Sequence, residues 1–123
     1  EAGVSVAPGD PVWEGWSRPV STHYPEVWDA PDDSFEGFVT ETVQYRIGKY
    51  VQHDHPTKIT DADARALNRK ILREVVEKEK HAFAERTVQH AYRPIERRKL
   101  EGNIREFVRL SIRRLHAQQG SAP

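Results

Sequence analysis

The residues most suggestive of catalysis are two histidines in a short polar stretch, His53-Asp54-His55-Pro56. In an extended segment alternate side chains point the same way, so both imidazoles would face one divalent transition metal. A metal site needs three or four ligands, and the local sequence adds only Asp54. We therefore keep two interpretations of His53 and His55: the metal site of an enzyme, or loop histidines that make hydrogen bonds or contact a partner.

The usual patterns of nucleophilic catalysis are missing from this sequence. It has no cysteine, no serine within a Gly-x-Ser-x-Gly turn, and no glycine pattern of a phosphate loop or dinucleotide site. The adjacent acids Asp32 and Asp33 are better explained as a helix cap than as a catalytic pair. We expect no cofactor in this chain and, apart from the histidine interpretation, no catalysis by the chain alone.

Arginine is concentrated in the last third of the chain. If residues 95–117 form a helix, one of its faces carries Arg98, Arg105, Arg109 and Arg113. This face lies opposite much of the stripe of apolar residues on the same helix. A guanidinium group makes paired hydrogen bonds to phosphate or to carboxylate. Glutamates are interspersed, however, and no named nucleic-acid-binding motif is present. This face is thus either a contact surface for RNA or DNA, or a charged surface that is solvated or pairs with acidic groups.

The first 33 residues are predicted to form an extended arm. Its five prolines stand three to eight residues apart, and each lacks an N–H and keeps its predecessor out of a helix. Yet the arm carries large aromatic rings that an isolated segment cannot bury, and such rings are the usual anchors of interfaces. We expect it to lie on a partner subunit, or else on the helices of its own chain, through Trp13, Trp16, Tyr24 and Trp28.

The rest of the chain is predicted as three helices, at residues 34–51, 61–92 and 95–117. Apolar residues recur every three or four positions in each, and capping signatures begin the first two, Asp33 with Glu36 and Thr60 with Asp63. Pro94 separates the last two and suits the first turn of a new helix. The β-branched stretch 39–47 also permits a strand, but a strand would bury Glu41, so a helix is preferred.

These elements give a mainly α fold with three parts. The extended arm occupies residues 1–33, the helical region residues 34–118, and a frayed polar terminus residues 119–123. At about 1.5 Å per residue the second helix would be roughly 48 Å long. We therefore expect it to protrude, to kink, or to lie along a neighbour.

The charge distribution and the low hydropathy favour a chain that functions bound to a partner. The net charge is zero, but residues 1–56 carry three basic and ten acidic side chains, and residues 57–123 carry sixteen basic and nine acidic. The two halves either attract each other or face different surfaces of a partner. Charged residues make up 31% of the chain and the mean hydropathy is −0.79, so the core should be small for a free monomer.

The favoured hypothesis is a small non-catalytic accessory subunit that wraps and stabilises a larger subunit of a hetero-oligomeric complex, an enzyme in the simplest case. The first alternative is an RNA-associated protein of a ribonucleoprotein particle, and the second is a metal-binding enzyme. The first ten residues lack the pattern of a secretory signal, and no run of about 18 apolar residues occurs. We therefore expect no membrane partner and a cytoplasmic protein, an organellar matrix being the other compartment.

Overall fold

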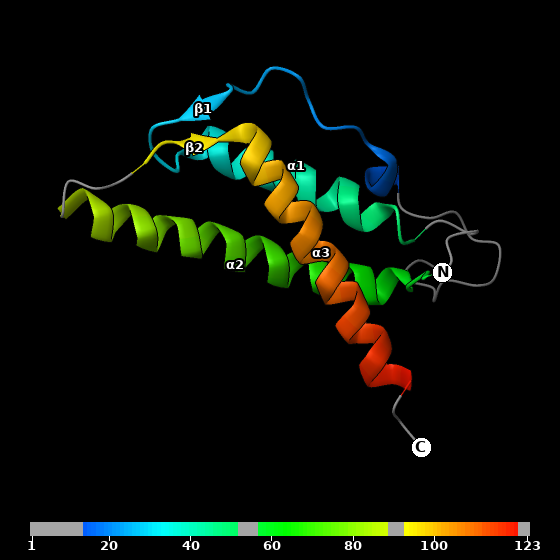
Figure 1. Ribbon diagram of the computed structural model, residues 1–123. Coiled ribbons are helices and arrows are strands. Elements are labelled where there is room, and N and C mark those ends of the chain that lie inside the picture. The colour runs from blue at the N-terminus through cyan, green and yellow to red at the C-terminus, as the bar shows by residue number, and fades with distance from the viewer. Residues whose placement is uncertain (1–13, 52–56, 89–92, 121–123) are drawn as a thin grey trace, which may run out of the picture.

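In the described part of the chain, residues 14–51, 57–88 and 93–120, the computed structural model has three long helices and one short strand pair (Figure 1). The elements in chain order are η1 (Glu14–Ser17), β1 (Val27–Trp28), α1 (Asp33–Gly48), α2 (Asp61–Val88), β2 (Ile95–Glu96) and α3 (Arg97–Gly120). The prediction of a mainly α fold is confirmed. Each helix begins or ends within a few residues of its predicted bounds.

The helix α1 lies at the centre of the molecule. It runs antiparallel beside α2, α3 crosses both helices, and residues 14–32 pass along the side of α1 away from α2 (Figure 1). Seven α1 residues are buried, on more than one side of the helix: Phe35, Phe38, Val39, Thr42, Val43, Ile47 and Gly48. The long helix α2 therefore lies along a neighbour, one of the three arrangements expected from its length.

The helix starts follow local hydrogen bonds, with two corrections to the predicted boundaries. The N-cap of α1 is Asp32, whose Oδ1 accepts from the Phe35 N–H at 2.9 Å, so the cap stands one residue earlier than predicted. Thr60 caps α2 as predicted, since its Oγ1 accepts from the Asp63 N–H at 3.1 Å. The third helix begins at Arg97 and not at residue 95, because Ile95–Glu96 pairs as a strand.

This strand pair ties the arm to the start of α3. It is antiparallel, with Val27 opposite Glu96 and Trp28 opposite Ile95. Arg97 adds three contacts to the same segment: its N–H donates to the Glu26 carbonyl at 2.9 Å, and its guanidinium donates to the Tyr24 carbonyl at 2.8 Å and to the Glu26 carboxylate at 2.7 Å. The acidic first half and the basic second half thus meet directly at this point.

The core is one continuous cluster that includes two arm residues. Trp16 and Trp28 are each 3% exposed and pack with the buried residues of all three helices. Two hydrogen bonds satisfy their indole N–H groups: Trp16 Nε1 donates to Asp61 Oδ1 at 2.7 Å, and Trp28 Nε1 donates to Ser34 Oγ at 3.1 Å. Burial of a ring with its N–H satisfied is favourable, so the arm itself enlarges the small core of the helices.

Candidate functional site

Three of the four predicted anchors of the arm lie on this chain's own helices. Trp16 and Trp28 are buried, and Tyr24 is partly buried against the same core, with its ring 5.4 Å from that of Phe38. In the described part of the arm, residues 14–32, these rings therefore pack in cis, and the Trp16 and Trp28 rings are buried within this chain. The fourth anchor, Trp13, lies outside the described residues.

Glu41 of α1 holds the arm through two hydrogen bonds. Its Oε1 accepts from the Ser21 N–H at 2.9 Å, and its Oε2 accepts from the Tyr24 hydroxyl at 2.7 Å. Desolvation alone would raise the pKa of Glu41, but these hydrogen bonds outweigh it and the pKa is lowered. Burial, with the carboxylate of Glu41 beside it, raises the pKa of Tyr24 to about 12.

We expect Glu41→Gln to cost about 1 to 2 kcal/mol of unfolding free energy near neutral pH, because an amide offers only one acceptor to the two donors. The folded carboxyl has a lowered pKa, so its contribution is present above its ordinary pKa and is lost as the pH falls through the folded value. The gap between wild type and variant should therefore shrink in acid. Urea unfolding of wild type and variant at about pH 7 and about pH 3 measures the stability difference at each pH. A difference that is larger at about pH 3 would contradict a lowered pKa of Glu41 in the folded protein.

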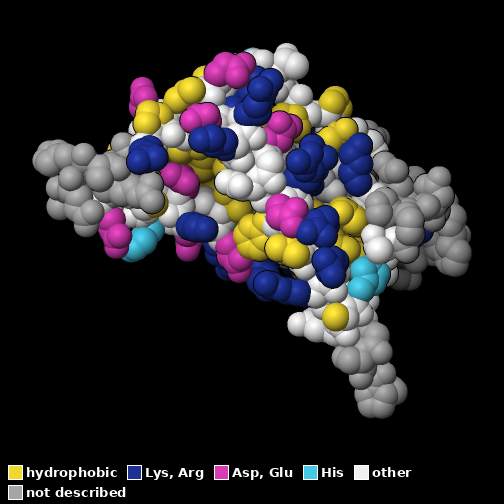
Figure 2. Space-filling model, viewed as in Figure 1, with side chains coloured by type: hydrophobic (Ala, Val, Ile, Leu, Met, Phe, Trp, Pro, Cys, Tyr) yellow, Lys and Arg dark blue, Asp and Glu magenta, His cyan; other side chains and the backbone are white. Residues whose placement is uncertain are grey.

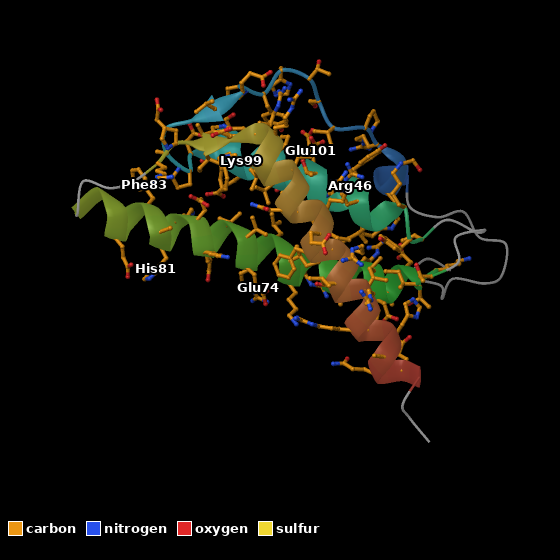
Figure 3. All side chains as sticks on the ribbon, in the orientation of Figure 1. Arg46, Glu74, His81, Phe83, Lys99 and Glu101 are labelled. Carbon is orange, nitrogen blue, oxygen red and sulfur yellow. The ribbon has the colours of Figure 1, made fainter. Side chains whose placement is uncertain are left out.

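The predicted metal ligands His53 and His55 lie outside the described residues. Among the residues that are described, no group of three His, Asp or Glu side chains could hold a metal ion. His81, on α2, pairs with Glu85 at 3.0 Å, and its side chain points away from the rest of the protein (Figure 3). The metal interpretation of His53 and His55 stays a prediction.

The predicted arginine face of α3 exists, but it is partly neutralised. Arg98, Arg105, Arg109 and Arg113 are all exposed, as their helical spacing predicts. Arg109 forms an ion pair with Glu106, and its guanidinium, followed by the charges of Arg105 and Arg113, lowers the pKa of that carboxyl although desolvation opposes the shift. The face is thus a mixture of charges, which is typical of a solvated helix surface.

A second line of arginines was missed, on α2. Arg65, Arg69 and Arg73 stand four residues apart and are all exposed, so they form a row along one flank of the helix, here called the arginine ladder. Arg65 is hydrogen-bonded to Asp61 at 2.7 Å. Within the described part of the chain, neither Arg69 nor Arg73 has a carboxylate within 4.0 Å. The four-residue spacing was visible in the sequence, but it does not show which flank of the helix borders a hollow.

Two hollows border the ladder and share Arg69. The first, of about 310 Å³, lies between α1 and α2, has Leu72 and Val76 as its apolar part, and includes Arg73. The second, of about 170 Å³, is lined by Trp16, Arg65, Asn68 and Arg69. The side-chain oxygen of Asn68 is buried and has no hydrogen-bond partner among the described residues.

The first hollow is lined by three cations, Arg69, Arg73 and Lys80, and by two acids, Glu36 and Glu77. Glu36, on its α1 side, is paired with Lys80 at 2.8 Å, and this hydrogen bond raises the pKa of Lys80. Glu77 is the other acid that lines the hollow. The ladder and its hollows can therefore bind a chain that carries anionic groups and a few apolar groups.

Comparison with known protein families, with curated proteins and with solved structures finds no significant match to this chain. Of the helices that the structure describes, none combines the length and the apolar character needed to cross a membrane.

Proposed function

We propose that this chain is a small non-catalytic accessory subunit and that it binds an acidic, extended segment of a larger protein along the arginine ladder. The observation that carries this proposal is a row of three exposed arginines at the border of two hollows. Because Trp16 and Trp28 are buried in cis, they do not support the idea that the described part of the arm wraps a partner. The proposal therefore rests on the surface of α2 alone.

The spacing of the ladder suits an extended peptide. Four residues of a helix rise by about 6 Å, and alternate residues of an extended chain lie about 6.6 Å apart on one side. Acidic side chains at every second position of a peptide would therefore meet Arg65, Arg69 and Arg73 in register. Each guanidinium can form two parallel hydrogen bonds with a carboxylate or a phosphorylated side chain.

The hollows favour a protein segment over a nucleic acid. Leu72 and Val76 offer an apolar contact to a side chain of a bound peptide. The aromatic residue that lines the ladder's hollows is Trp16, which is buried, whereas single-stranded nucleic acids are bound mainly by stacking on exposed rings. RNA binding is the alternative that the experiment must distinguish.

The decisive experiment measures the binding of the full chain to short labelled probes by fluorescence anisotropy. The probes are peptides with glutamate or phosphoserine at alternate positions, a matched glutamine peptide and a single-stranded RNA. We expect the two acidic peptides to bind and the glutamine peptide not to bind. The replacement Arg69→Glu with Arg73→Glu should weaken binding of the acidic peptides by about 2 kcal/mol, about 30-fold in Kd.

A matched double variant on α3 controls for net charge. Arg98→Glu with Arg105→Glu changes the charge by the same amount on exposed residues of the other helix, and should leave peptide binding within about twofold. If the α3 variant weakens binding of the acidic peptides as much as the α2 variant does, the attraction is non-specific and the ladder is not the binding site. If only RNA binds, with a steep salt dependence, the ribonucleoprotein alternative is correct.

A further inference from the structure

An apolar groove lies between α2 and α3, on the flank of α2 away from the arginine ladder. It has a volume of about 640 Å³ and is lined on its α3 side by Leu100, Ile104, Phe107 and Leu110, with Val75 from α2. In Figure 2 hydrophobic side chains gather near the place where α3 crosses α2, and charged side chains surround them. Among the described residues the exposed large hydrophobic side chains are Leu110, at 38%, and Val27, at 47%.

The outer side of α3 has the residue spacing of a helix that packs on another helix. Positions 103, 107, 110, 114 and 117 recur at intervals of four and three, which is the spacing of the seam between two packed helices. Asn103, Phe107 and Leu110 of this seam line the apolar groove, and Arg114 lines the adjoining hollow together with Phe107 and Glu74. The groove therefore continues along α3 and is bordered by charges of both signs.

We infer that the occupant of this groove is a second copy of the chain, whose α3 packs antiparallel to the first α3 with the two Leu110 side chains at the centre. An interface with twofold symmetry must be self-complementary, because each contact occurs twice. In an antiparallel pair centred on Leu110, residues at equal distances before and after it lie opposite each other. This condition decides which charges meet.

The charges of α3 satisfy the condition. Glu106, four residues before Leu110, is paired with Arg109 of its own chain. It lies opposite Arg114, four residues after Leu110, so each copy of Glu106 meets a second arginine across the contact. Phe107, three residues before the centre, lies opposite Arg113, whose stem covers the ring and whose guanidinium reaches toward Glu74 beside Phe107. Arg113 has no carboxylate within 4.0 Å among the described residues of its own chain.

Sedimentation equilibrium of the full chain tests the inference. We expect a monomer–dimer equilibrium with a Kd of about 10 to 100 µM, because the contact is small for a stable dimer. Leu110→Glu should raise the Kd at least about tenfold, since it places a charge at the centre of the contact. Val27→Glu, at the other exposed large hydrophobic residue, should leave the Kd unchanged. Circular dichroism of both variants is the control for folding, and we expect the helical signal of the wild type.

A charge exchange tests the antiparallel register. Glu106→Arg alone places two arginines opposite each other, and Arg114→Glu alone places two glutamates opposite each other, so each variant should be monomeric. An equimolar mixture of the two variants should dimerise again, because each unlike pair is restored in the mixed dimer. A wild type that stays monomeric up to about 500 µM overturns the inference. So does a dimer that Leu110→Glu does not weaken, or a mixture that does not dimerise.

The same variants separate this inference from the proposed function. The ladder's first hollow is shared with α1 residues, whereas the groove is shared with α3. Leu110→Glu should therefore leave the binding of acidic peptides within about twofold of wild type. Loss of dimerisation with unchanged peptide binding is the expected result. Failure of peptide binding in a chain that still dimerises would overturn the proposed function alone.

Discussion

Replacing Trp28 by alanine should lower the free energy of unfolding by about 3 to 5 kcal/mol. The ring is 3% exposed, and its centroid lies 5.2 Å from that of Phe38 and 5.9 Å from that of Phe35. The substitution removes these contacts and leaves Ser34 without the indole donor that it accepts from at 3.1 Å. Because small domains are stable by only about 5 to 15 kcal/mol, the loss is large, and denaturant unfolding followed by circular dichroism measures it.

The neighbouring residue supplies the matched control. Val27 lies in the same strand and pairs with Glu96 as Trp28 pairs with Ile95, but it is 47% exposed. Val27→Ala should therefore cost no more than about 1 kcal/mol. If the two variants were equally stable, the Trp28 ring would not be part of this chain's core. The hypothesis that it anchors a partner would then regain its support.

The helices could be predicted because their determinants are local. Apolar residues at helical spacing mark each helix, and Thr60 caps α2 through a hydrogen bond three residues along the chain. Glu41 excluded a strand at residues 39–47, and the structure shows a helix there. The capping-box pattern favours Asp33, because Glu36 stands three residues after it, but the α1 cap is Asp32, whose side chain accepts from the Phe35 N–H.

The packing of the arm could not be predicted, because its partners are distant in sequence. Two-residue strands carry no alternation, so nothing in the sequence showed that Val27–Trp28 pairs with Ile95–Glu96. The hydrogen bond from Trp16 to Asp61 likewise spans 45 positions. A tryptophan looks the same in the sequence whether its ring is buried in its own chain or exposed to a partner. The sequence alone therefore left both packing in cis and docking in trans open.

The candidate site at the arginine ladder could not be predicted for the same reason, because it depends on contacts between residues that are distant in sequence. Arginines four residues apart on a helix are common on solvated surfaces, where they pair with acids one turn away, as Arg65 does with Asp61. What distinguishes Arg69 and Arg73 is that both line the hollow between α1 and α2, and that Arg69 also lines the hollow beside Trp16. That position depends on how α1 and the arm pack on α2, and hence on the contacts that the sequence does not specify.

Adding one methyl group to Gly48 should cost about 2 to 4 kcal/mol and should release the start of the described arm from α1. A Cβ at this position would lie 2.0 Å from the carbonyl oxygen of Trp16 and 2.8 Å from its carbonyl carbon. These are backbone atoms, so no side-chain rotation relieves the clash, and η1 must move away from the helix. In Gly48→Ala we expect a lower midpoint of urea unfolding and, because Trp16 becomes solvated, a shift of the summed tryptophan fluorescence toward longer wavelength.

The chain contains its own control in Gly102, on α3. A Cβ there meets no atom within 4 Å, and alanine is favoured over glycine inside a helix by about 1 kcal/mol. Gly102→Ala should therefore stabilise the protein by about that amount, while the same change at Gly48 destabilises it. Since helix propensity acts in the same direction at both sites, the difference between the two variants isolates the close approach of Trp16 to α1. Two variants of equal stability would mean that the arm does not occupy this position.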